Sequence, residues 1–493
     1  MKTIARLAIA VVALTPALLV TATLHGTQSN TTVPSAPPKD PTTAAIIREG
    51  KDNSHVMDTL RYIAVNIGAR CTGSPELERG ERWAVSQFKT YGCDNVHREK
   101  WEDVPGFQRG PNQTARMIKP IPADFVFSTN VWTQGTNGPV RGIAVVDPTT
   151  MDEAKAKAKD LKGAWVLMNY KVSMGGARNR DDKDLKAFVD SCGIAGRVYP
   201  STNELVHTHG SYKWKVGDKM DYKTPKSHPM DVDITIRKSD MERIKRWMAQ
   251  EPVTLEFNIE NRWLKPIPQY NVIADIKGTE KPDEMVIVSG HFDSWNGPGS
   301  QGANDNGTGS AMTLEAARIL TAVHAKPKRT IRFILWTGEE QGLLGSGAYV
   351  QKHKDEMNKI SAVIVDDGGT GYHGGYAVLD TMKDMMSDAV APVNNAFPDM
   401  PDKIVVTKRF SQETGSDHDS FMRFAVPAFF TMEGGNVDYG YIWHSQNDRI
   451  ENSNGKFMTQ SATDAAAVAW SLANAESLLP RTKPVASDAG GKA

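Results

Sequence analysis

The sequence predicts an α/β fold in which a mainly parallel mixed sheet is covered by helices on both faces. Short apolar runs of strand length alternate with amphipathic helical segments, which is typical of parallel sheets. Acidic residues and histidines follow directly after several of these runs, at the edge where sites form in open α/β sheets. At 493 residues the chain exceeds what one core usually supports, so we expect a smaller domain inserted into the main one.

Composition excludes several classes of protein. Lys+Arg and Asp+Glu both number 58, so no basic field indicates nucleic acid or an anionic membrane. We therefore expect no nucleic-acid partner and no stable membrane contact, while the sequence leaves a monomer and a homodimer open. Cys71 and Cys93 could form a disulfide, which would leave Cys192 unpaired, and the sequence does not decide this. The three cysteines also lack the spacing of a structural zinc site.

The N-terminal residues 1–22 have the features of a secretory signal. A basic start, an apolar stretch broken by Pro16 and small residues at Val20-Thr21-Ala22 favour export and cleavage. The alternative is an uncleaved membrane anchor, because the apolar stretch is long enough to span a bilayer. We expect residues 23–43 to be a solvated linker and residues 481–493 to be a disordered tail. The protein would then be secreted or periplasmic, or membrane-anchored in the alternative.

The mature chain divides into three segments. Residues 44–125 begin the main domain, with an amphipathic helix predicted at 76–91 and a strand at 96–102. From residue 126 the pattern changes to short apolar runs and polar excursions, without a cluster of acids or histidines. We interpret 126–255 as an inserted domain that carries little chemistry; the alternative is that it continues one large sheet. Residues 256–480 return to the main domain and contain the candidate site.

Candidate metal ligands follow the predicted strands of this last segment. His291 ends a buried strand, and Asp293 is placed to hold its other ring nitrogen. The adjacent Glu339 and Glu340 follow the next strand, so one of them can bind a metal while the other faces substrate as a general base. One of these glutamates, together with Asp305, Asp367, His291 and His444, gives a set of three carboxylates and two histidines. This set suits two zinc ions sharing one carboxylate.

Other catalytic motifs are weak or absent. Residues 297–302 fit the G-x-G-x-x-G pattern, but they include a proline and do not follow their strand directly, which argues against dinucleotide binding. The sequence contains neither a G-x-S-x-G nucleophile elbow nor an H-E-x-x-H zinc helix. The ligand set above is therefore the main chemical signal.

Four motifs carry a family resemblance. In order and spacing they are similar to those of the co-catalytic zinc exopeptidases of metallopeptidase family 28, including its plasma glutamate carboxypeptidase-like branch. The resemblance implies the zinc-exopeptidase, phosphorylase/hydrolase-like fold, with a protease-associated domain at 126–255. The motifs are His291-Phe292-Asp293-Ser294, Ala303-Asn304-Asp305-Asn306-Gly307, Trp336-Thr337-Gly338-Glu339-Glu340-Gln341-Gly342 and Tyr441-Ile442-Trp443-His444.

The resemblance also implies a role for each ligand. His291 would bind one zinc ion, and Asp305 would bridge the two ions. Glu340 and His444 would bind the second ion. Asp367 would be the ligand at a strand end, with its neighbour Asp366 as the fallback.

The catalytic roles follow from the same resemblance. Glu339 would be the general base. Some aminopeptidases of the family carry a tyrosine before the last histidine, where it helps to stabilise the oxyanion. Trp443 occupies that position here, so the residue that would stabilise the oxyanion is left open. Tyr441 is a possible substitute.

We expect a secreted zinc-dependent exopeptidase with peptide substrates and two zinc ions per chain, acting as an aminopeptidase or dipeptidase. A carboxypeptidase-like specificity on the same site is the first alternative. A binding protein without catalysis is the second, although such a protein would have no reason to keep Glu339.

Overall fold

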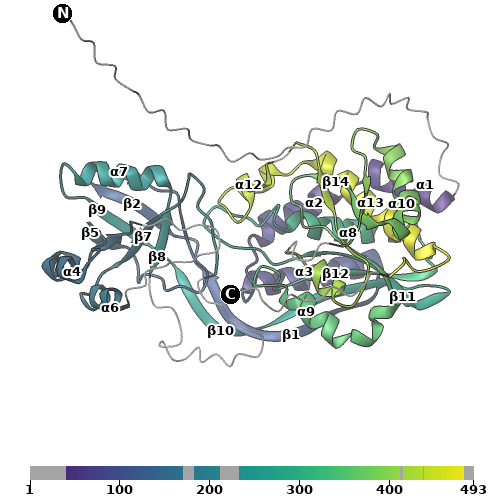
Figure 1. The fold of residues 1–493 in the computed structure, drawn as a ribbon, viewed down its shortest axis with the longest axis horizontal. Helices are drawn as coiled ribbons and strands as arrows, with labels where there is room; N and C mark the ends of the chain where they lie inside the picture. The colour runs from purple at the N-terminus through teal and green to yellow at the C-terminus, as the bar shows by residue number, and fades with distance from the viewer. Residues whose placement is uncertain (1–39, 170–182, 211–231, 411–414, 437, 482–493) are drawn as a thin grey trace, which may run out of the picture. The chain divides into compact units, whose positions relative to one another are not determined.

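The computed structural model describes residues 40–169, 183–210, 232–410, 415–436 and 438–481 (Figure 1). The expected signal at 1–22, residues 23–39 of the expected linker and the expected tail beyond residue 481 lie outside the described residues. Residues 37–493 form one compact unit.

The first helix, α1 (Pro41–Asp52), takes in the last three residues of the expected linker. The Asp40 side chain caps it by accepting the N–H groups of Thr42 and Thr43. A proline at the first helical position also favours this start.

A six-stranded sheet forms the centre of the main domain. Its three pairings from β12 to β16 are parallel, whereas β1 pairs antiparallel with β10 and β10 with β12. This arrangement confirms the predicted mainly parallel mixed sheet. In order across the sheet the strands are β1 (Asp94–Arg109), β10 (Asn261–Ile276), β12 (Arg329–Trp336), β11 (Lys281–His291), β13 (Ile360–Val365) and β16 (Ala428–Phe430).

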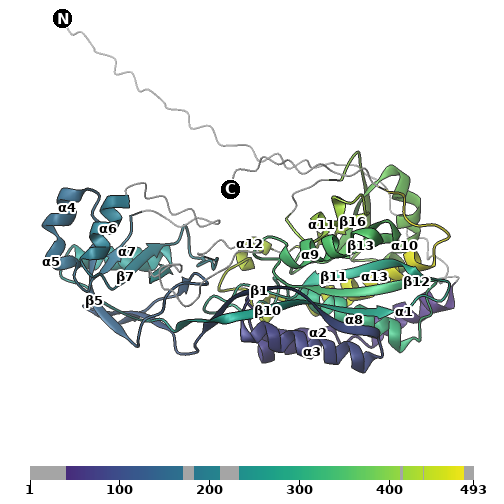
Figure 2. The same ribbon diagram turned by 90° about the horizontal axis from the view of Figure 1, so that it is seen from below.

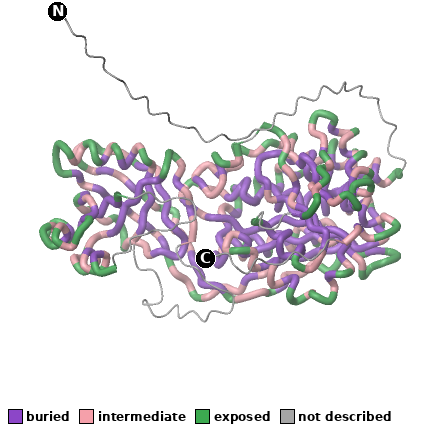
Figure 3. Tube along the Cα trace, in the orientation of Figure 1, coloured by how far each residue is buried: buried purple, intermediate pink, exposed green. Residues whose placement is uncertain are grey.

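Helices cover both faces of this sheet. Figure 2 shows α3 and α8 on one side of the strands and α9 and α11 on the other. Because both faces are covered, the central strands are almost continuously buried, as the tube in Figure 3 shows. The helices of the main domain are α2 (Val56–Arg61), a π-helical turn (Tyr62–Ile67), α3 (Pro75–Tyr91), α8 (Gly307–Ala322), α9 (Leu344–Lys352), α10 (Lys383–Ala396), α11 (His418–Met422), α12 (Tyr439–Ile442) and α13 (Gly455–Asn474).

A small sheet flanks the C-terminal part of the main domain. It consists of β15 (Lys403–Thr407), β14 (Tyr372–Leu379) and β17 (Met432–Gly434). Helix α10 contacts both β14 and β15.

A second sheet of eight strands lies between β1 and β10 in the chain. It has its own apolar core, in which Trp165 packs edge-on against Phe257. The strands span Thr114 to Asn258, a range that contains the segment 126–255 and extends beyond it at both ends. They are β3 (Ala123–Asp124), β2 (Thr114–Lys119), β9 (Thr254–Asn258), β5 (Val140–Val146), β6 (Trp165–Leu167), β7 (Gly196–Pro200), β8 (Asp233–Ile236) and β4 (Phe127–Thr129), with helices α4 (Met151–Ala156), α5 (Ala158–Leu161), α6 (Lys183–Ser191) and α7 (Lys238–Met248).

A long two-stranded ribbon connects the two sheets. Strands β1 and β10 pair from Asp94 with Asp275 to Arg109 with Asn261 (Figure 2). The chain leaves the main sheet along β1 and returns along β10, so the second sheet is an excursion between two paired strands.

The three cysteines are free. Cys71 is buried beside Phe107 and Val131, and Cys93 packs against the main core. The disulfide that the sequence left open is therefore absent.

Within the described residues, no helix combines the length and the apolar character needed to cross a membrane.

Candidate metal centre

Two overlapping groups of ligand-type side chains lie at the C-terminal edge of the main sheet. His291, Asp305 and Asp367 form the first group, and Asp305, Glu340 and His444 form the second. Within each group the ligand atoms lie within 4.8 Å of one another. Asp305 belongs to both groups, so the structure brings together all five residues that the sequence singled out as ligands.

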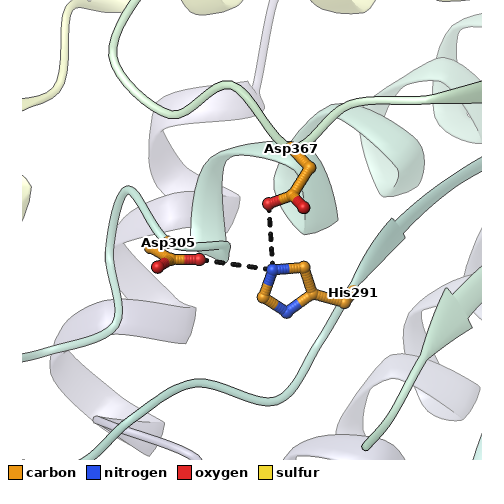
Figure 4. A group of neighbouring side chains, drawn as sticks. All are labelled: His291, Asp305 and Asp367. Atoms are coloured by element: carbon orange, nitrogen blue, oxygen red, sulfur yellow. Dashed lines mark hydrogen bonds and ion pairs between the residues drawn. The ribbon is translucent and has the colours of Figure 1, made fainter. Parts of the chain in front are cut away.

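His291 is held at the end of β11 with both ring nitrogens engaged. Its Nε2 lies 3.0 Å from Oδ1 of Asp367 and 3.3 Å from Oδ1 of Asp305, and these side chains point toward one another in Figure 4. Its Nδ1 lies 2.9 Å from the backbone carbonyl of Asp293. This second contact fixes the ring so that Nε2 faces the carboxylates.

The Asp293 side chain has a different position from the one expected. Its nearer carboxylate oxygen is 3.7 Å from Nδ1 of His291, so the backbone carbonyl rather than the carboxylate holds the ring. The carboxylate instead accepts the N–H groups of Glu339 at 3.2 Å and Glu340 at 3.3 Å. It also accepts the hydroxyl of Thr72. Asp293 thus ties the loop after β12 to the loop after β11.

Asp305 is positioned by the start of helix α8. The next residue, Asn306, caps this helix by accepting the N–H of Gly309, and its amide donates to the backbone carbonyl of Asp366. A Cβ at Gly309 would lie 2.2 Å from that same carbonyl oxygen. A side chain here would push the helix away from β13, so glycine allows the close approach that brings Asp305 to the sheet edge.

The structure separates the roles of the adjacent Asp366 and Asp367. Oδ2 of Asp366 lies 3.2 Å from Nε2 of the buried His373, whose Nδ1 lies 2.9 Å from Asp464. Asp366 is therefore engaged in a buried network beneath the site. Of the two candidates, Asp367 is the one whose carboxylate faces His291.

Glu339 and Glu340 diverge as expected from adjacent residues. Oε2 of Glu340 lies 3.0 Å from Nε2 of His444, whereas Oε2 of Glu339 lies 3.9 Å from Nε2 of His291. Gly338 precedes them with φ of +77°, a conformation that L side chains rarely adopt. Glu340 thus joins the second ligand group and Glu339 stands outside both.

The electrostatics of the centre fit a bound cation. Burial raises the pKa of Glu339, Glu340 and Asp367, and nearby carboxylates raise each of them further. Burial acts on Asp305 in the same direction, but the hydrogen bond from His291 and the charge of His444 outweigh it and lower the pKa. A cation among these carboxylates would relieve their mutual repulsion. Oδ2 of Asp305, which is buried, also has no hydrogen-bond partner in the described part of the chain.

A cavity of about 500 Å³ opens onto the centre. No lysine or arginine is among its described lining residues. Arg70 lies nearby, but it is buried and its guanidinium donates to the backbone carbonyls of Phe292 and Gly302. The lining consists of Asp305, Glu339, Glu340, Gly342, Leu343, Asp367, Gly415, Phe430, Tyr439, Trp443 and His444.

The candidate substrate residues differ in how they meet this cavity. Trp443 lines it and stacks on His444 with ring centroids 4.0 Å apart. Tyr441 is 50% exposed and is not among the lining residues. It lies in the short helix α12.

Tyr439 lines the cavity and was missed from the sequence. Its ring packs where Gly369 lacks a side chain, since a Cβ there would lie 2.3 Å from the ring. Burial, and then the charges of Asp305 and Asp367, raise the pKa of Tyr439 well above its usual value, so its hydroxyl stays protonated. The sequence does contain a signal for this contact: the glycines at positions 368 and 369, directly after Asp367, leave room for a bulky side chain to approach the loop.

One histidine of the second sheet's segment, His209, also reaches the centre, although the sequence had suggested no histidine cluster there. The backbone N–H of Thr208, between His207 and His209, donates to the carbonyl of His444 at 2.8 Å. The ring of His209 lies 5.4 Å from that of His444. Only folding brings them together, because more than 230 residues separate His209 from His444 in the sequence.

Comparison with known proteins shows that the chain is similar to peptidases. Residues 271–469 match the model of Peptidase family M28. Carboxypeptidase Q of Mus musculus is 26% identical over 436 residues, which cover 88% of each chain. Leucine aminopeptidase 1 of Ajellomyces dermatitidis is 29% identical over 258 residues, covering 48% of this chain and 64% of its own.

Two solved structures share the fold. A peptidase M28 precursor from Shewanella amazonensis aligns with a TM-score of 0.65 at 23% identity, over 90% of this chain and 98% of its own. A zinc aminopeptidase from Bacillus subtilis aligns with a TM-score of 0.53 at 20% identity, over 84% of this chain and 93% of its own.

Proposed function

The chain carries a peptidase family M28 domain, and from this premise we propose that it is a di-zinc exopeptidase acting as an aminopeptidase or dipeptidase. The observation that carries the proposal is the pair of ligand groups that share Asp305. Relatives named leucine aminopeptidase and carboxypeptidase support an exopeptidase. The named zinc aminopeptidase supports zinc as the metal.

The two groups would divide the zinc ions between them. His291 and Asp367 would hold one ion, Glu340 and His444 would hold the other, and Asp305 would serve both. The nitrogen and carboxylate ligands are those that zinc prefers in catalytic sites. Zinc ions held here would supply Lewis acidity, which polarises a peptide carbonyl and activates water.

Glu339 is the general base of the proposed reaction. Its carboxylate belongs to neither ligand group, yet it lines the cavity beside them. It takes a proton from the attacking water and passes it to the leaving amine. The N–H of Glu339 is held by Asp293, which keeps the carboxylate at the edge of the centre.

Tyr439 is the proposed donor to the oxyanion. Its side chain lines the cavity and its raised pKa keeps the hydroxyl protonated, so it can serve as a donor to the oxyanion. Tyr441, the substitute named from the sequence, is half-exposed and outside the lining. Trp443 instead forms an apolar wall beside His444.

The cavity favours a free α-amine over a terminal carboxylate. The described lining holds no lysine or arginine to pair with a substrate carboxylate, whereas Glu339, which is no zinc ligand, offers a carboxylate close to where a substrate would bind. Leu343, Phe430 and Trp443 add apolar surface for a substrate side chain. The named carboxypeptidase at 26% identity keeps a carboxypeptidase specificity as the second candidate.

A matched panel of peptides tests whether the enzyme acts at the N-terminus of its substrate, as proposed. We expect cleavage of a short peptide with both termini free, no cleavage of its N-acetylated form, which keeps a free C-terminal carboxylate, and loss of activity with a chelator. Cleavage of the acetylated peptide from its C-terminus would favour the carboxypeptidase. Zinc binding without cleavage of any peptide would favour a non-catalytic binding protein.

The remaining segments complete the proposal. Residues 44–125 and 256–480 form the peptidase domain, and residues 126–255 form a protease-associated-like insert that shapes access to the centre. The signal features of residues 1–22 support a secreted or periplasmic protein. N-terminal sequencing tests this: a start between residues 23 and 27 supports export, whereas an intact start in the membrane fraction indicates an anchor.

A further inference from the structure

A short segment of the insert is bonded to the loop that carries His444. His207 forms an antiparallel bridge with Ser445, and the N–H of Thr208 donates to the carbonyl of His444 at 2.8 Å. The N–H of Val206 donates to Oε1 of Gln446 at 2.9 Å, and the Gln446 amide donates back to the carbonyl of Glu204 at 3.2 Å. Segment 204–209 therefore holds the backbone at His444 and Ser445, and it also holds the side chain of Gln446.

His444 needs such support because its backbone is strained. Its φ is +52°, in the left-handed region that a residue with a side chain rarely occupies. Such a conformation costs free energy and persists only where the surroundings hold it. The hydrogen bond from Thr208 acts on the carbonyl of this very residue.

Aromatic rings pack against the ring of His444. The His209 ring meets it at 5.4 Å with planes inclined by 73°, and the Trp295 ring meets it at 6.0 Å with the same inclination. His209 and Trp295 also contact each other edge-to-face, at 6.2 Å. The three rings form one packed group.

Among the described residues, none forms a hydrogen bond with the second ring nitrogen of His444, Nδ1. A metal-binding histidine usually donates its other N–H to a carbonyl or carboxylate, and this contact orients the ring. Nδ1 of His444 is buried and has no partner among the residues that the structure describes. Nε2 of His209 is likewise buried without a described partner, so the contact between the rings is one of packing.

We propose that His209 is a positioning residue of the insert, whose ring holds His444 with Nε2 directed at Asp305 and Glu340. His209 is not among the lining residues of the cavity, so it acts through His444 rather than on substrate. The insert thereby sets the affinity of the second zinc position, the one formed by Asp305, Glu340 and His444. This inference rests on the proposed zinc ligands, but not on which peptide is cleaved.

Metal binding to three variants tests the inference. His209→Ala removes the ring, and His209→Phe keeps a ring of similar shape. His207→Phe is the matched control in the same segment, because it keeps the ring that stacks on that of His209 at 6.2 Å. We expect His209→Ala to weaken one of two zinc affinities about 10- to 100-fold, the range for loss of groups that orient ligands. His209→Phe should restore most of this loss, and His207→Phe should leave both affinities unchanged.

Two further readouts separate positioning from a general loosening of the fold. The visible spectrum of the cobalt-substituted protein should change in His209→Ala and return toward wild type in His209→Phe. The thermal unfolding temperature of the metal-free protein should be the same in all three variants and wild type. Unchanged zinc affinities in His209→Ala would overturn the inference, as would equal weakening of both sites together with a lowered unfolding temperature.

The phenylalanine variant also decides what the ring contributes. If His209→Phe behaved like His209→Ala, packing would not be the cause and the inference would be wrong. A wild-type protein that binds two zinc ions but cleaves no peptide would refute the proposed function alone. A wild-type protein that binds only one ion would refute both.

Discussion

The two oxygens of Asp305 face different histidines: Oδ1 lies 3.3 Å from Nε2 of His291, and Oδ2 lies 3.3 Å from Nε2 of His444. A carboxylate in this position can bridge two metal ions, each with its own histidine. We therefore expect metal analysis of the purified protein to give close to two zinc ions per chain. Asp305→Ala should lose both ions, whereas His444→Ala should lose one. A value near one in the fully active wild type would contradict this prediction.

The adjacent glutamates offer a matched pair of variants. Glu339→Gln should retain both zinc ions and lose turnover by about 100- to 10,000-fold, because it removes the general base but no ligand. Glu340→Gln makes the same nearly isosteric change one residue later, and it should release zinc from the second position. Zinc content and kcat measured on the same preparations check both expectations. An exchange of the two phenotypes would mean that the roles of Glu339 and Glu340 are reversed.

Zinc binding should strengthen as pH rises. Burial raises the pKa of Glu340 and of Asp367, and the carboxylates Asp367 and Glu339 raise the pKa of His291 despite its burial. In the metal-free protein these three ligands therefore keep protons to higher pH than in an unfolded chain. Zinc must displace these protons, so its affinity falls as pH falls through the raised pKa values and levels off above them.

Calorimetry in buffers of different ionisation enthalpy measures this proton release directly. We expect net release of protons on zinc binding near neutral pH, and more release per zinc at lower pH. Proton uptake, or an affinity independent of pH across the acidic range, would contradict the raised pKa values.

The sequence predicted the main fold because its signals are local. The apolar runs at β11, β12 and β13 are each followed by polar residues and glycines, and strand ends of a parallel sheet meet at one edge. Ligands placed after such strands were therefore found together. The sequence could not show that the carboxylate of Asp293 serves the loop of Glu339 rather than the ring of His291, because this depends on how two loops turn.

Residues that reach the site from far along the chain left no local signal. His209 contacts His444 only because segment 204–209 pairs with the loop after α12. Tyr439 and Tyr441 are two residues apart, and no periodicity distinguishes the one that faces the cavity. The short helix α12 determines which tyrosine faces the cavity, because it turns Tyr439 toward Gly369 and leaves Tyr441 at the surface.

These two tyrosines give the last prediction. Tyr439→Phe removes one hydroxyl and keeps the ring that packs against Gly369, so folding and zinc content should not change. If the hydroxyl donates to the developing oxyanion, kcat should fall about 100- to 1,000-fold, the range for loss of one such donor. KM should change little, because the hydrogen bond forms mainly in the transition state. Tyr441→Phe is the control and should match the wild type in both constants. A loss of kcat in Tyr441→Phe but not in Tyr439→Phe would restore Tyr441 as the donor and remove Tyr439 from the reaction.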